Sequence, residues 1–336
     1  MKLADPRGKV YVFLDELQYF TDWQVFVKSK YEREDIKFIV TGSNSQLLSS
    51  DLITLLSGRT SPLALFPFDF HEYLLARGER IISAIQAVRN RHRLRKLCDE
   101  YLVCGGFPEV VLIENRRLIK DILANYARNI LYQDIVPRFE LKKPYEVEKL
   151  FFYLVSNMTG LFTFNKLAHL VDLSDKTVRD YISFFEDAFL LYTVDRFDFS
   201  VKKLRGPKKI YCVDNGLSAS VAFSFSENRG RYLENMVFGT LVRNEQNIFY
   251  YKTKTGLEVD FFCPGIGGRG QLLQVCADLQ DEKIRKREIR ALCMAADELD
   301  LEGGTIVTMD EEEEIMEQGK AIKIIPAWKY FSIPGF

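Results

Sequence analysis

The sequence predicts an α/β protein made of several consecutive units. Two short apolar runs near the start are spaced like buried parallel strands with a helix between them. A long helical stretch follows, and the second half alternates helices with strands. The 336 residues suffice for two or three buried cores. We expect a truncated parallel sheet at 1–75, a helical lid at 76–140, a helix-and-hairpin unit at 141–214 and an α/β unit at 215–336.

The composition argues against several classes of function. Lysine and arginine (46) nearly cancel aspartate and glutamate (47), so any nucleic-acid site must be a local patch. No apolar run approaches the roughly 20 residues that a membrane helix needs. The six cysteines never have CxxC spacing, and the three histidines are far apart, which makes a zinc site improbable. With no recognisable secretory leader, we expect a cytoplasmic protein without a membrane partner.

The first unit is predicted from two strands that end in polar residues. Residues 9–14 form an apolar, β-rich run that is followed by Asp15 and Glu16. Residues 37–41 form a second run, which is followed by Gly-Ser-Asn-Ser at 42–45. Open α/β sheets place their ligands at the C-terminal ends of the strands, so both ends are candidate site positions.

An apolar strand that delivers Asp15 and Glu16 suits nucleotide hydrolysis. The aspartate would hold magnesium, directly or through water, and the glutamate would polarise the water that attacks a γ-phosphate. A polar residue after the next strand, Ser43 or Asn44, would lie beside that phosphate, and Arg59 offers a cation further on. The alternative is an acidic turn after a core strand.

The sequence that follows the helical region predicts three helices and a hairpin. Apolar residues repeat at intervals of three and four from 147 to 158, and a second short helix spans about 164–171. Ser174 caps a third helix, whose buried face is expected to consist of Val178, Tyr181, Ile182, Phe185 and Phe189. Two β-rich runs follow, at 190–197 and 209–213. Three helices and a two-stranded hairpin make a winged helix-turn-helix.

The turn of this hairpin is strongly basic, with five Lys or Arg among eight residues. They are Lys202, Lys203, Arg205, Lys208 and Lys209. In a wing they could contact DNA phosphates, while the start of the capped helix would meet base edges. The residues expected there are Lys176, Thr177 and Arg179. A few phosphate contacts on a neutral protein predict weak, salt-sensitive binding. The alternative is a solvated turn on a winged helix that contacts protein.

The C-terminal unit follows the layout of the PD-(D/E)XK nuclease fold. Glu234 lies on a predicted helix, Glu258 and Asp260 on a strand, and Gln274 on the next strand. Such nucleases need an aspartate and a glutamate for magnesium and a lysine two residues after the second acid. Gln274 stands at that second acid position and Cys276 at the lysine position. We therefore expect a degenerate nuclease site kept for binding or structure.

Nuclease activity remains an alternative, with Asp260 as a magnesium ligand. Arg287 and Glu288 on the following helix could partly substitute for the missing groups, and Lys252 or Lys254 could supply the lysine. The charged helix at 281–296 could equally be a solvated face. The acidic run at 310–314 is expected to open a surface helix, because negative charge suits a helix N-terminus.

Eight segments along the chain carry a resemblance to one family. They are FLDELQ at 13–18, TGSNSQLL at 41–48, LSGR at 56–59, LFPFDFHEYL at 65–74, GGFPEVVL at 105–112, ENMVFGTL at 234–241, EVDFF at 258–262 and REIRAL at 287–292. Together they resemble the AAA-type ATPases of archaea and bacteria that carry a C-terminal domain of unknown function, in the order of that family and over nearly the whole chain.

This resemblance implies a P-loop sheet that uses Mg-ATP in the intact family. Asp15 and Glu16 would form the Walker B motif, Asn44 or Ser43 would be sensor 1, and Arg59 would be an arginine finger or sensor. An arginine finger makes sense only where subunits meet, so a homo-oligomer is a possible partner, as is DNA.

The sequence departs from the family at the phosphate-binding loop. That loop, G-x-x-x-x-G-K-[ST], holds the β- and γ-phosphates through its backbone amides and lysine, and it occurs nowhere in the 336 residues. Either Met1 is a false or truncated start, or this is a degenerate member. We therefore expect no bound ATP and impaired hydrolysis for this chain, which would act on or near DNA. The alternatives are a non-enzymatic DNA-binding module and a magnesium-dependent nuclease.

Overall fold

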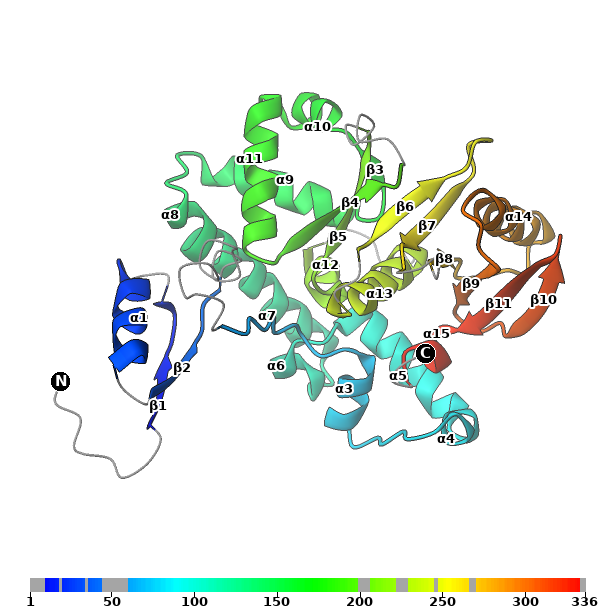
Figure 1. The fold of residues 1–336 in the computed structure, drawn as a ribbon, viewed down its shortest axis with the longest axis horizontal. Helices are drawn as coiled ribbons and strands as arrows, with labels where there is room; N and C mark the ends of the chain where they lie inside the picture. Colours follow the sequence, from blue (N-terminus) through cyan, green and yellow to red (C-terminus); the bar gives the residue numbers. More distant parts are fainter. Residues whose placement is uncertain are drawn as a thin grey trace.

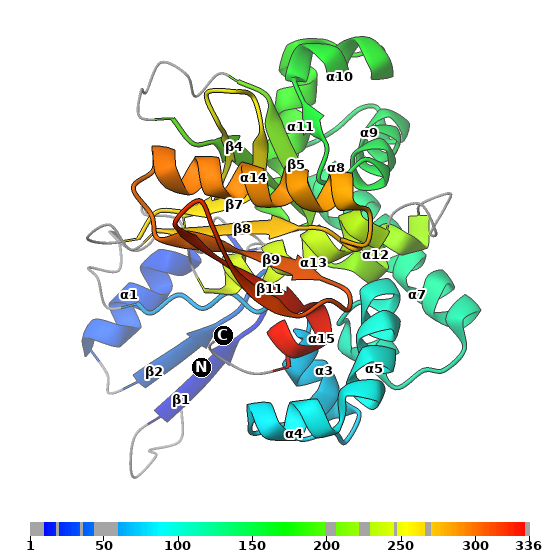
Figure 2. The ribbon, with the colours of Figure 1, turned by 90° about the vertical axis from the view of Figure 1, so that its right-hand side faces the viewer.

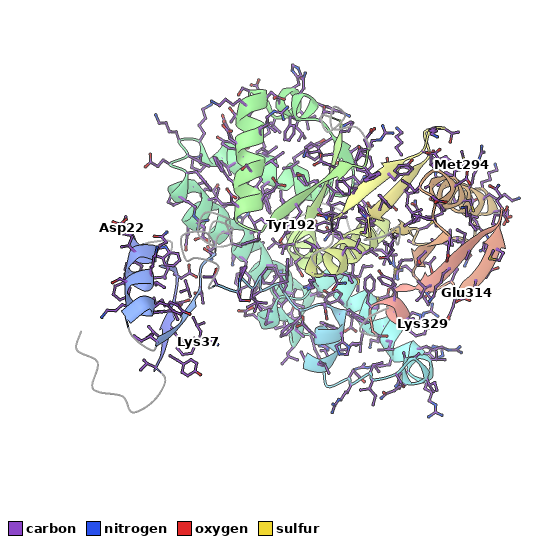
Figure 3. All side chains as sticks on the ribbon, in the orientation of Figure 1. Asp22, Lys37, Tyr192, Met294, Glu314 and Lys329 are labelled. Atoms are coloured by element: carbon purple, nitrogen blue, oxygen red, sulfur yellow. The ribbon has the colours of Figure 1, made fainter. Side chains whose placement is uncertain are left out.

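The computed structural model describes residues 10–17, 20–33, 36–43, 60–198, 206–221, 229–244, 247–265 and 270–332. A small N-terminal unit lies at one end of a larger body of helices and strands (Figure 1). Side chains fill the larger body densely, and the N-terminal unit, which carries Asp22 and Lys37, stands apart from it (Figure 3).

The N-terminal unit is a two-stranded parallel sheet with one helix. Strand β1 (Val10–Leu14) pairs with β2 (Ile36–Val40) from Val10 opposite Ile36 to Leu14 opposite Val40. Helix α1 (Trp23–Arg33) covers one face, where Leu17, Trp23 and Val27 form a small core. Both predicted strands and the helix between them are confirmed.

A helical region follows, as predicted, and residues 105–107 separate two of its helices. Its helices are α3 (Phe70–Ala76), α4 (Ala84–Arg89), α5 (Arg91–Cys104), α6 (Pro108–Val111), α7 (Arg116–Asn129), a π-helical turn (Ile130–Ile135) and α8 (Val136–Arg138). Asp69 caps α3 in a reciprocal capping box with Glu72, which fixes where this helix begins.

The next segment holds three helices and three short strands. These are α9 (Pro144–Ser156), β3 (Leu161–Phe162), α10 (Phe164–Val171), α11 (Asp175–Asp187), β4 (Leu191–Arg196) and β5 (Lys208–Cys212). The hydroxyl of Ser174 accepts a hydrogen bond from Thr177 N, so the predicted cap of α11 is confirmed. The apolar face predicted for α11 is buried at Val178, Tyr181, Ile182 and Phe185.

The hairpin belongs to a nine-stranded mixed sheet. Its other strands are β6 (Phe249–Lys252), β7 (Glu258–Cys263), β8 (Gln271–Val275), β9 (Gly303–Thr308), β10 (Glu313–Glu317) and β11 (Lys320–Pro326), and the order is β10-β11-β9-β8-β7-β6-β4-β5-β3. Strand β4 pairs in parallel with β6, at Asp195 opposite Phe249 and Arg196 opposite Tyr250. This pairing makes the hairpin and the C-terminal strands one sheet.

Helices cover this sheet and complete its core. They are α12 (Asn215–Val221), α13 (Arg229–Arg243), α14 (Glu282–Glu298) and α15 (Ala327–Tyr330). Figure 2 shows α14 lying across the C-terminal strands. One buried apolar cluster runs from Phe70 to Phe331 through the helical region, the hairpin and α13, so these segments share a core.

The prediction of a surface helix that begins at residues 310–314 is wrong. The chain forms the β10–β11 hairpin there, with Glu313 opposite Ile324. Its two turn residues, Gln318 (φ 52°) and Gly319 (φ 75°), are both left-handed, as the tightest hairpin turns require. Glu313 and Glu314 lie on β10, the edge strand, where charge opposes pairing with another chain.

Candidate functional site

Asp15 and Glu16 lie together at the C-terminal edge of the two-stranded sheet. The Thr41 hydroxyl, which follows β2, donates a short hydrogen bond to Asp15 Oδ1. The Thr41 hydroxyl oxygen accepts from Glu16 N at 3.2 Å, and Thr41 N donates to Leu14 O at 2.9 Å. The backbone of Glu16 has a φ of 52°, an uncommon value for a residue other than glycine. The ends of the strands thus fix the Asp15 carboxylate and the backbone of Glu16.

Arg138 reaches this edge from the helical region. Its Nη2 donates to Ser43 Oγ at 3.3 Å, although the residues are 95 positions apart. The neighbouring Phe139 stacks on Phe184 of α11, with ring centroids 3.7 Å apart. The sequence analysis missed Arg138, because only the packing of α8 against the end of β2 brings it here. Asn44 and Arg59 lie outside the described residues.

The residues at this edge fit one half of a magnesium–nucleotide site. Carboxylate and hydroxyl oxygens are the ligands that Mg²⁺ prefers, and Asp15 and Glu16 are both exposed. The glycine-rich loop and lysine that would hold the phosphates have no counterpart in the 336-residue sequence.

A second cluster of charged groups is buried in the large sheet, around Lys209 of β5. Its ammonium lies 2.8 Å from Asp260 Oδ1, 3.0 Å from Glu234 Oε1 and 3.0 Å from Glu258 Oε1. The Lys209 side chain is only 3% exposed, whereas that of Glu258 is 31% exposed. The structure therefore brings the predicted acids Glu234, Glu258 and Asp260 together around a lysine that the sequence analysis had placed elsewhere.

Gln274 completes this cluster with a set of internal hydrogen bonds. Its Oε1 accepts from Asp260 N at 3.1 Å, and its Nε2 donates to Glu288 Oε2 at 2.7 Å. Asp260 Oδ2 accepts from Val275 N at 2.9 Å. The thiol of Cys276 points to Asp278 O at 3.1 Å.

Burial shifts the protonation of the cluster. Burial alone would lower the pKa of Lys209, but the Asp260 and Glu234 carboxylates outweigh it and raise that pKa well above its ordinary value. Burial, together with the charge of Asp260, raises the pKa of Glu234 to about 7. Lys209 and the Tyr211 hydroxyl, which donates to Glu234 Oε1 at 2.8 Å, act in the opposite direction. Lys209 therefore stays cationic, and Glu234 is the group that takes up a proton near neutrality.

The structure corrects part of the predicted DNA-binding set. Lys209 is not a surface cation, because its ammonium is enclosed by carboxylates. Lys208, next to it, pairs with Asp195 at 2.8 Å. The other basic residues of the turn, Lys202, Lys203 and Arg205, lie outside the described residues. The ammonium within the acid cluster comes from Lys209 and not from Lys252 or Lys254.

The first turn of α11 keeps its predicted cations at the surface. Lys176 and Arg179 are exposed, and Thr177 is partly exposed beside the Ser174 cap. Arg179 pairs with Asp175 at 2.7 Å, and its guanidinium lies 3.9 Å from the centroid of the Phe164 ring. Of these two cations, Arg179 is therefore the one already held by local contacts.

Gly106, between α5 and α6, and Gly216 of α12 are explained by close approaches of the backbone. Gly106 N donates to Asp214 Oδ2 at 2.7 Å, and a Cβ on Gly106 would lie 1.9 Å from Phe68 O. A Cβ on Gly216 would lie 2.1 Å from Cys104 O. Only glycine allows the two backbones to approach this closely. Burial raises the pKa of Asp214, while hydrogen bonds from the backbone amides of Gly106, Leu217 and Gly216 oppose the rise.

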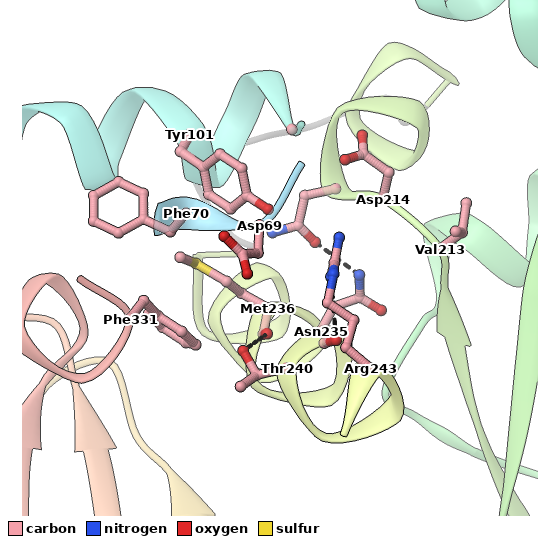
Figure 4. Close-up of a pocket in the computed structure, with 13 residues that line it drawn as sticks. Asp69, Phe70, Tyr101, Val213, Asp214, Asn235, Met236, Thr240, Arg243 and Phe331 are labelled. Atoms are coloured by element: carbon pink, nitrogen blue, oxygen red, sulfur yellow. Dashed lines mark hydrogen bonds between the residues drawn. The ribbon is translucent and has the colours of Figure 1, made fainter. Parts of the chain in front are cut away.

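A small polar cavity lies beside these close approaches. Figure 4 shows Asp69, Asp214, Asn235 and Arg243 among the residues that line it. Arg243 donates to Pro67 O and Gly239 O, which fixes it across the cavity. The volume of about 20 Å³ has room for about one water molecule. We therefore regard this cavity as structural.

Two other features are absent from the described residues. These residues contain no group of three or more His, Cys, Asp or Glu side chains arranged to hold a metal ion. None of the helices that the structure describes is long and apolar enough to cross a membrane.

Three sequence families match successive parts of the chain. The family described as "AAA domain" matches residues 1–74. Two domains of unknown function, DUF8612 and DUF4143, match residues 95–228 and 229–330. In the solved structure of Thermococcus gammatolerans McrB AAA+ hexamers with bound McrC, one chain is 9% identical over 55% of this chain and 48% of its own, with a TM-score of 0.24. That similarity is too low to support an argument.

Several relatives match most of the chain. The uncharacterised protein MJ1544 of Methanocaldococcus jannaschii is 31% identical over 340 residues, which cover 95% of this chain and 74% of the relative. An uncharacterised protein of Haemophilus influenzae is 31% identical over 77% of this chain and 64% of its own length. MJ1637 of M. jannaschii is 23% identical over 72% of this chain and 54% of its own. The chain belongs to the family of MJ1544, with an AAA domain at its N-terminal end and a DUF4143 domain towards its C-terminal end.

Proposed function

We propose that this chain is a relative of the AAA-family ATPases that carries the magnesium-binding, water-activating half of a nucleotide site. The observation that carries the proposal is the hydrogen bond from the Thr41 hydroxyl to Asp15, beside Glu16, within the segment that matches an AAA domain. Asp15 would hold Mg²⁺, and Glu16 would polarise the attacking water. Ser43 would face the γ-phosphate, with Arg138 beside it.

The apolar surface of the N-terminal unit supports this proposal. Tyr11 and Phe13 of β1 are 55% and 73% exposed, on the face of the sheet opposite the Trp23 core. Parallel sheets are normally covered on both faces, so this surface suits further polypeptide of the same domain. We propose that such polypeptide brings the phosphate-binding loop, and that the 336 residues alone do not hydrolyse ATP.

The test starts from the coding DNA upstream of the Met1 codon, translated in all three frames. If a G-x-x-x-x-G-K-[ST] motif follows a predicted strand there, the restored protein is expected to release phosphate from Mg-ATP. Glu16→Gln should lower kcat by about 100-fold or more with nucleotide binding kept, because it removes the group that polarises water. Asp15→Asn should weaken the dependence on Mg²⁺.

A matched control is Asp22→Asn, a carboxylate of the same unit away from the strand ends. Hydrolysis unchanged in Asp15→Asn and Glu16→Gln would refute these roles. If no such motif occurs upstream, the nucleotide site is vestigial and the proposal fails.

We propose as a second function a weak, salt-dependent contact with DNA. Helices α9, α10 and α11 with the β4–β5 hairpin would form a winged helix whose α11 presents Lys176. The exposure of this lysine beside the Ser174 cap favours the proposal, since recognition helices contact DNA through their first turns. The buried Lys209 removes one of the expected phosphate contacts.

Anisotropy of a labelled duplex tests this contact. We expect the binding constant to fall between 50 and 200 mM salt. In a plot of its logarithm against the logarithm of the salt concentration, each lost phosphate contact should reduce the slope by about 1. Lys176→Ala should reduce the affinity, whereas Lys286→Ala, at an exposed lysine of α14, should not. Equal effects of the two changes would refute a role for α11.

We further infer that the C-terminal unit has a PD-(D/E)XK-like arrangement without nuclease activity. Helix α13 carries Glu234, β7 carries Glu258 and Asp260, and β8 carries Gln274, which is the order that such a fold uses. A nuclease of this kind implies a divalent metal among these acids. The residues do not fit it, because the Lys209 ammonium lies where all three carboxylates converge.

A further inference from the structure

The Lys209 ammonium has the contacts of a bound cation. It offers three N–H donors, and three carboxylates, from Asp260, Glu234 and Glu258, lie 2.8 to 3.0 Å away. Each carboxylate comes from a different position on α13 or β7, and the lysine comes from β5. The side chain is almost fully enclosed, so water does not replace these partners.

We propose that the ammonium of Lys209 stands in for a divalent cation in this cluster, closes it to metal ions, and ties β5 to α13 and β7. Removal of this one charge would open a metal site that the native chain does not use.

The spacing of the oxygens supports a lysine rather than a metal. Ammonium–oxygen distances of 2.8 to 3.0 Å suit hydrogen bonds. Mg²⁺ demands oxygens at about 2.0–2.1 Å, so each carboxylate would have to move inward by about 0.7 Å or more. Asp260 cannot do so freely, because its Oδ2 is bound to Val275 N at 2.9 Å.

The balance of charge explains why a cation is required. Three carboxylates and one ammonium leave the cluster with a formal charge of −2 when all are ionised. Loss of the lysine charge would leave the carboxylates of Glu234, Asp260 and the partly exposed Glu258 with no counter-ion, an arrangement that proteins avoid by binding a cation or a proton. Gln274 stands at the predicted position of a further acid. Because it is neutral, the cluster has one negative charge fewer for Lys209 to balance.

Mn²⁺ binding tests the proposal, by electron paramagnetic resonance and by thermal unfolding with and without millimolar MnCl₂. All proteins carry Asp15→Asn, because Asp15 is proposed to bind a divalent cation itself, and the result is then independent of the nucleotide site. With Lys209 intact, we expect no Mn²⁺ binding and no change of Tm. Lys209→Ala should lower the Tm by at least about 5 °C, bind Mn²⁺ at millimolar concentration, and regain Tm when Mn²⁺ is added.

Two further variants keep the test decisive. Adding Asp260→Asn to Lys209→Ala should abolish the new binding, and Lys208→Ala, a loss of the neighbouring surface cation, should create none. If Lys209→Ala does not fold, Lys209→Met combined with Glu234→Gln removes one buried negative charge and should still bind Mn²⁺ through Glu258 and Asp260. Three results would overturn the proposal: Mn²⁺ bound by the cluster with Lys209 in place, none bound after its removal, or DNA cleavage that needs both Lys209 and Asp260.

Discussion

Glu234→Gln should change how the stability of the protein depends on pH. Glu234 shares the Lys209 ammonium with two other carboxylates, and its side chain is 12% exposed. Glutamine has nearly the same shape, and its Oε1 can still accept the hydrogen bonds from Lys209 and Tyr211. The change therefore removes the ionisation of this side chain and keeps its packing.

The size of the effect follows from the raised pKa. The pKa of Glu234 is 4.5 when exposed and about 7 in the fold. The folded state therefore holds this proton more tightly, and the stabilisation is complete below pH 4.5 and lost as the pH rises through 7. The rise corresponds to about 3 kcal/mol of unfolding free energy. The native protein should lose that amount over this range relative to Glu234→Gln.

Fluorescence of Trp328 during urea unfolding measures this difference at pH 5 and pH 8. The residue packs in the core that α13 shares, and Trp23→Phe removes the other tryptophan. Glu282→Gln, at a 68% exposed carboxylate, is the matched control and should follow the native pH dependence. If native protein and Glu234→Gln lose stability in parallel between the two pH values, the assigned pKa of Glu234 is wrong.

Two other substitutions test the packing by urea unfolding. Gly106→Ala should destabilise the fold by at least about 3 kcal/mol, because its Cβ would collide with Phe68 O, whereas Gly230→Ala meets no atom within 4 Å and should be neutral or slightly stabilising. Phe151→Ala should cost about 3–5 kcal/mol, since the ring is fully buried, and Tyr145→Ala, at a 74% exposed ring, about 0.5 kcal/mol or less. Equal costs within either pair would contradict the placement of these residues.

Local patterns predicted the helices and strands well where a single segment carries the signal. The Ser174 cap and the apolar face of α11 could be predicted from the spacing of residues within that one segment. The acidic run at 310–314 failed because charge suits a helix N-terminus and an edge strand alike. What decided it was the left-handed turn at Gln318 and Gly319, together with the pairing of β11 with β9.

The acid cluster shows why the candidate site was only partly predictable. Glu234, Glu258 and Asp260 were found from their order on a helix and a strand. Lys209 was missed because neighbouring residues of a strand point to opposite faces, and the sequence does not say which of Lys208 and Lys209 faces inward. The register of β5 against β4, with Val194 opposite Lys209, and the pairing of β4 with β6 decide it.

The two carboxylate sites of this chain therefore differ in what completes them. Asp15 and Glu16 are exposed at the end of β1, where the Thr41 hydroxyl donates to Asp15, so a cation from outside can reach them. Glu234 and Asp260 are buried and already hold the chain's own ammonium. A divalent cation added to the protein should for this reason act at the N-terminal edge and leave the C-terminal cluster unchanged. Mn²⁺ bound by the native protein and lost in Asp15→Asn, but kept in Asp260→Asn, is the result that this difference requires.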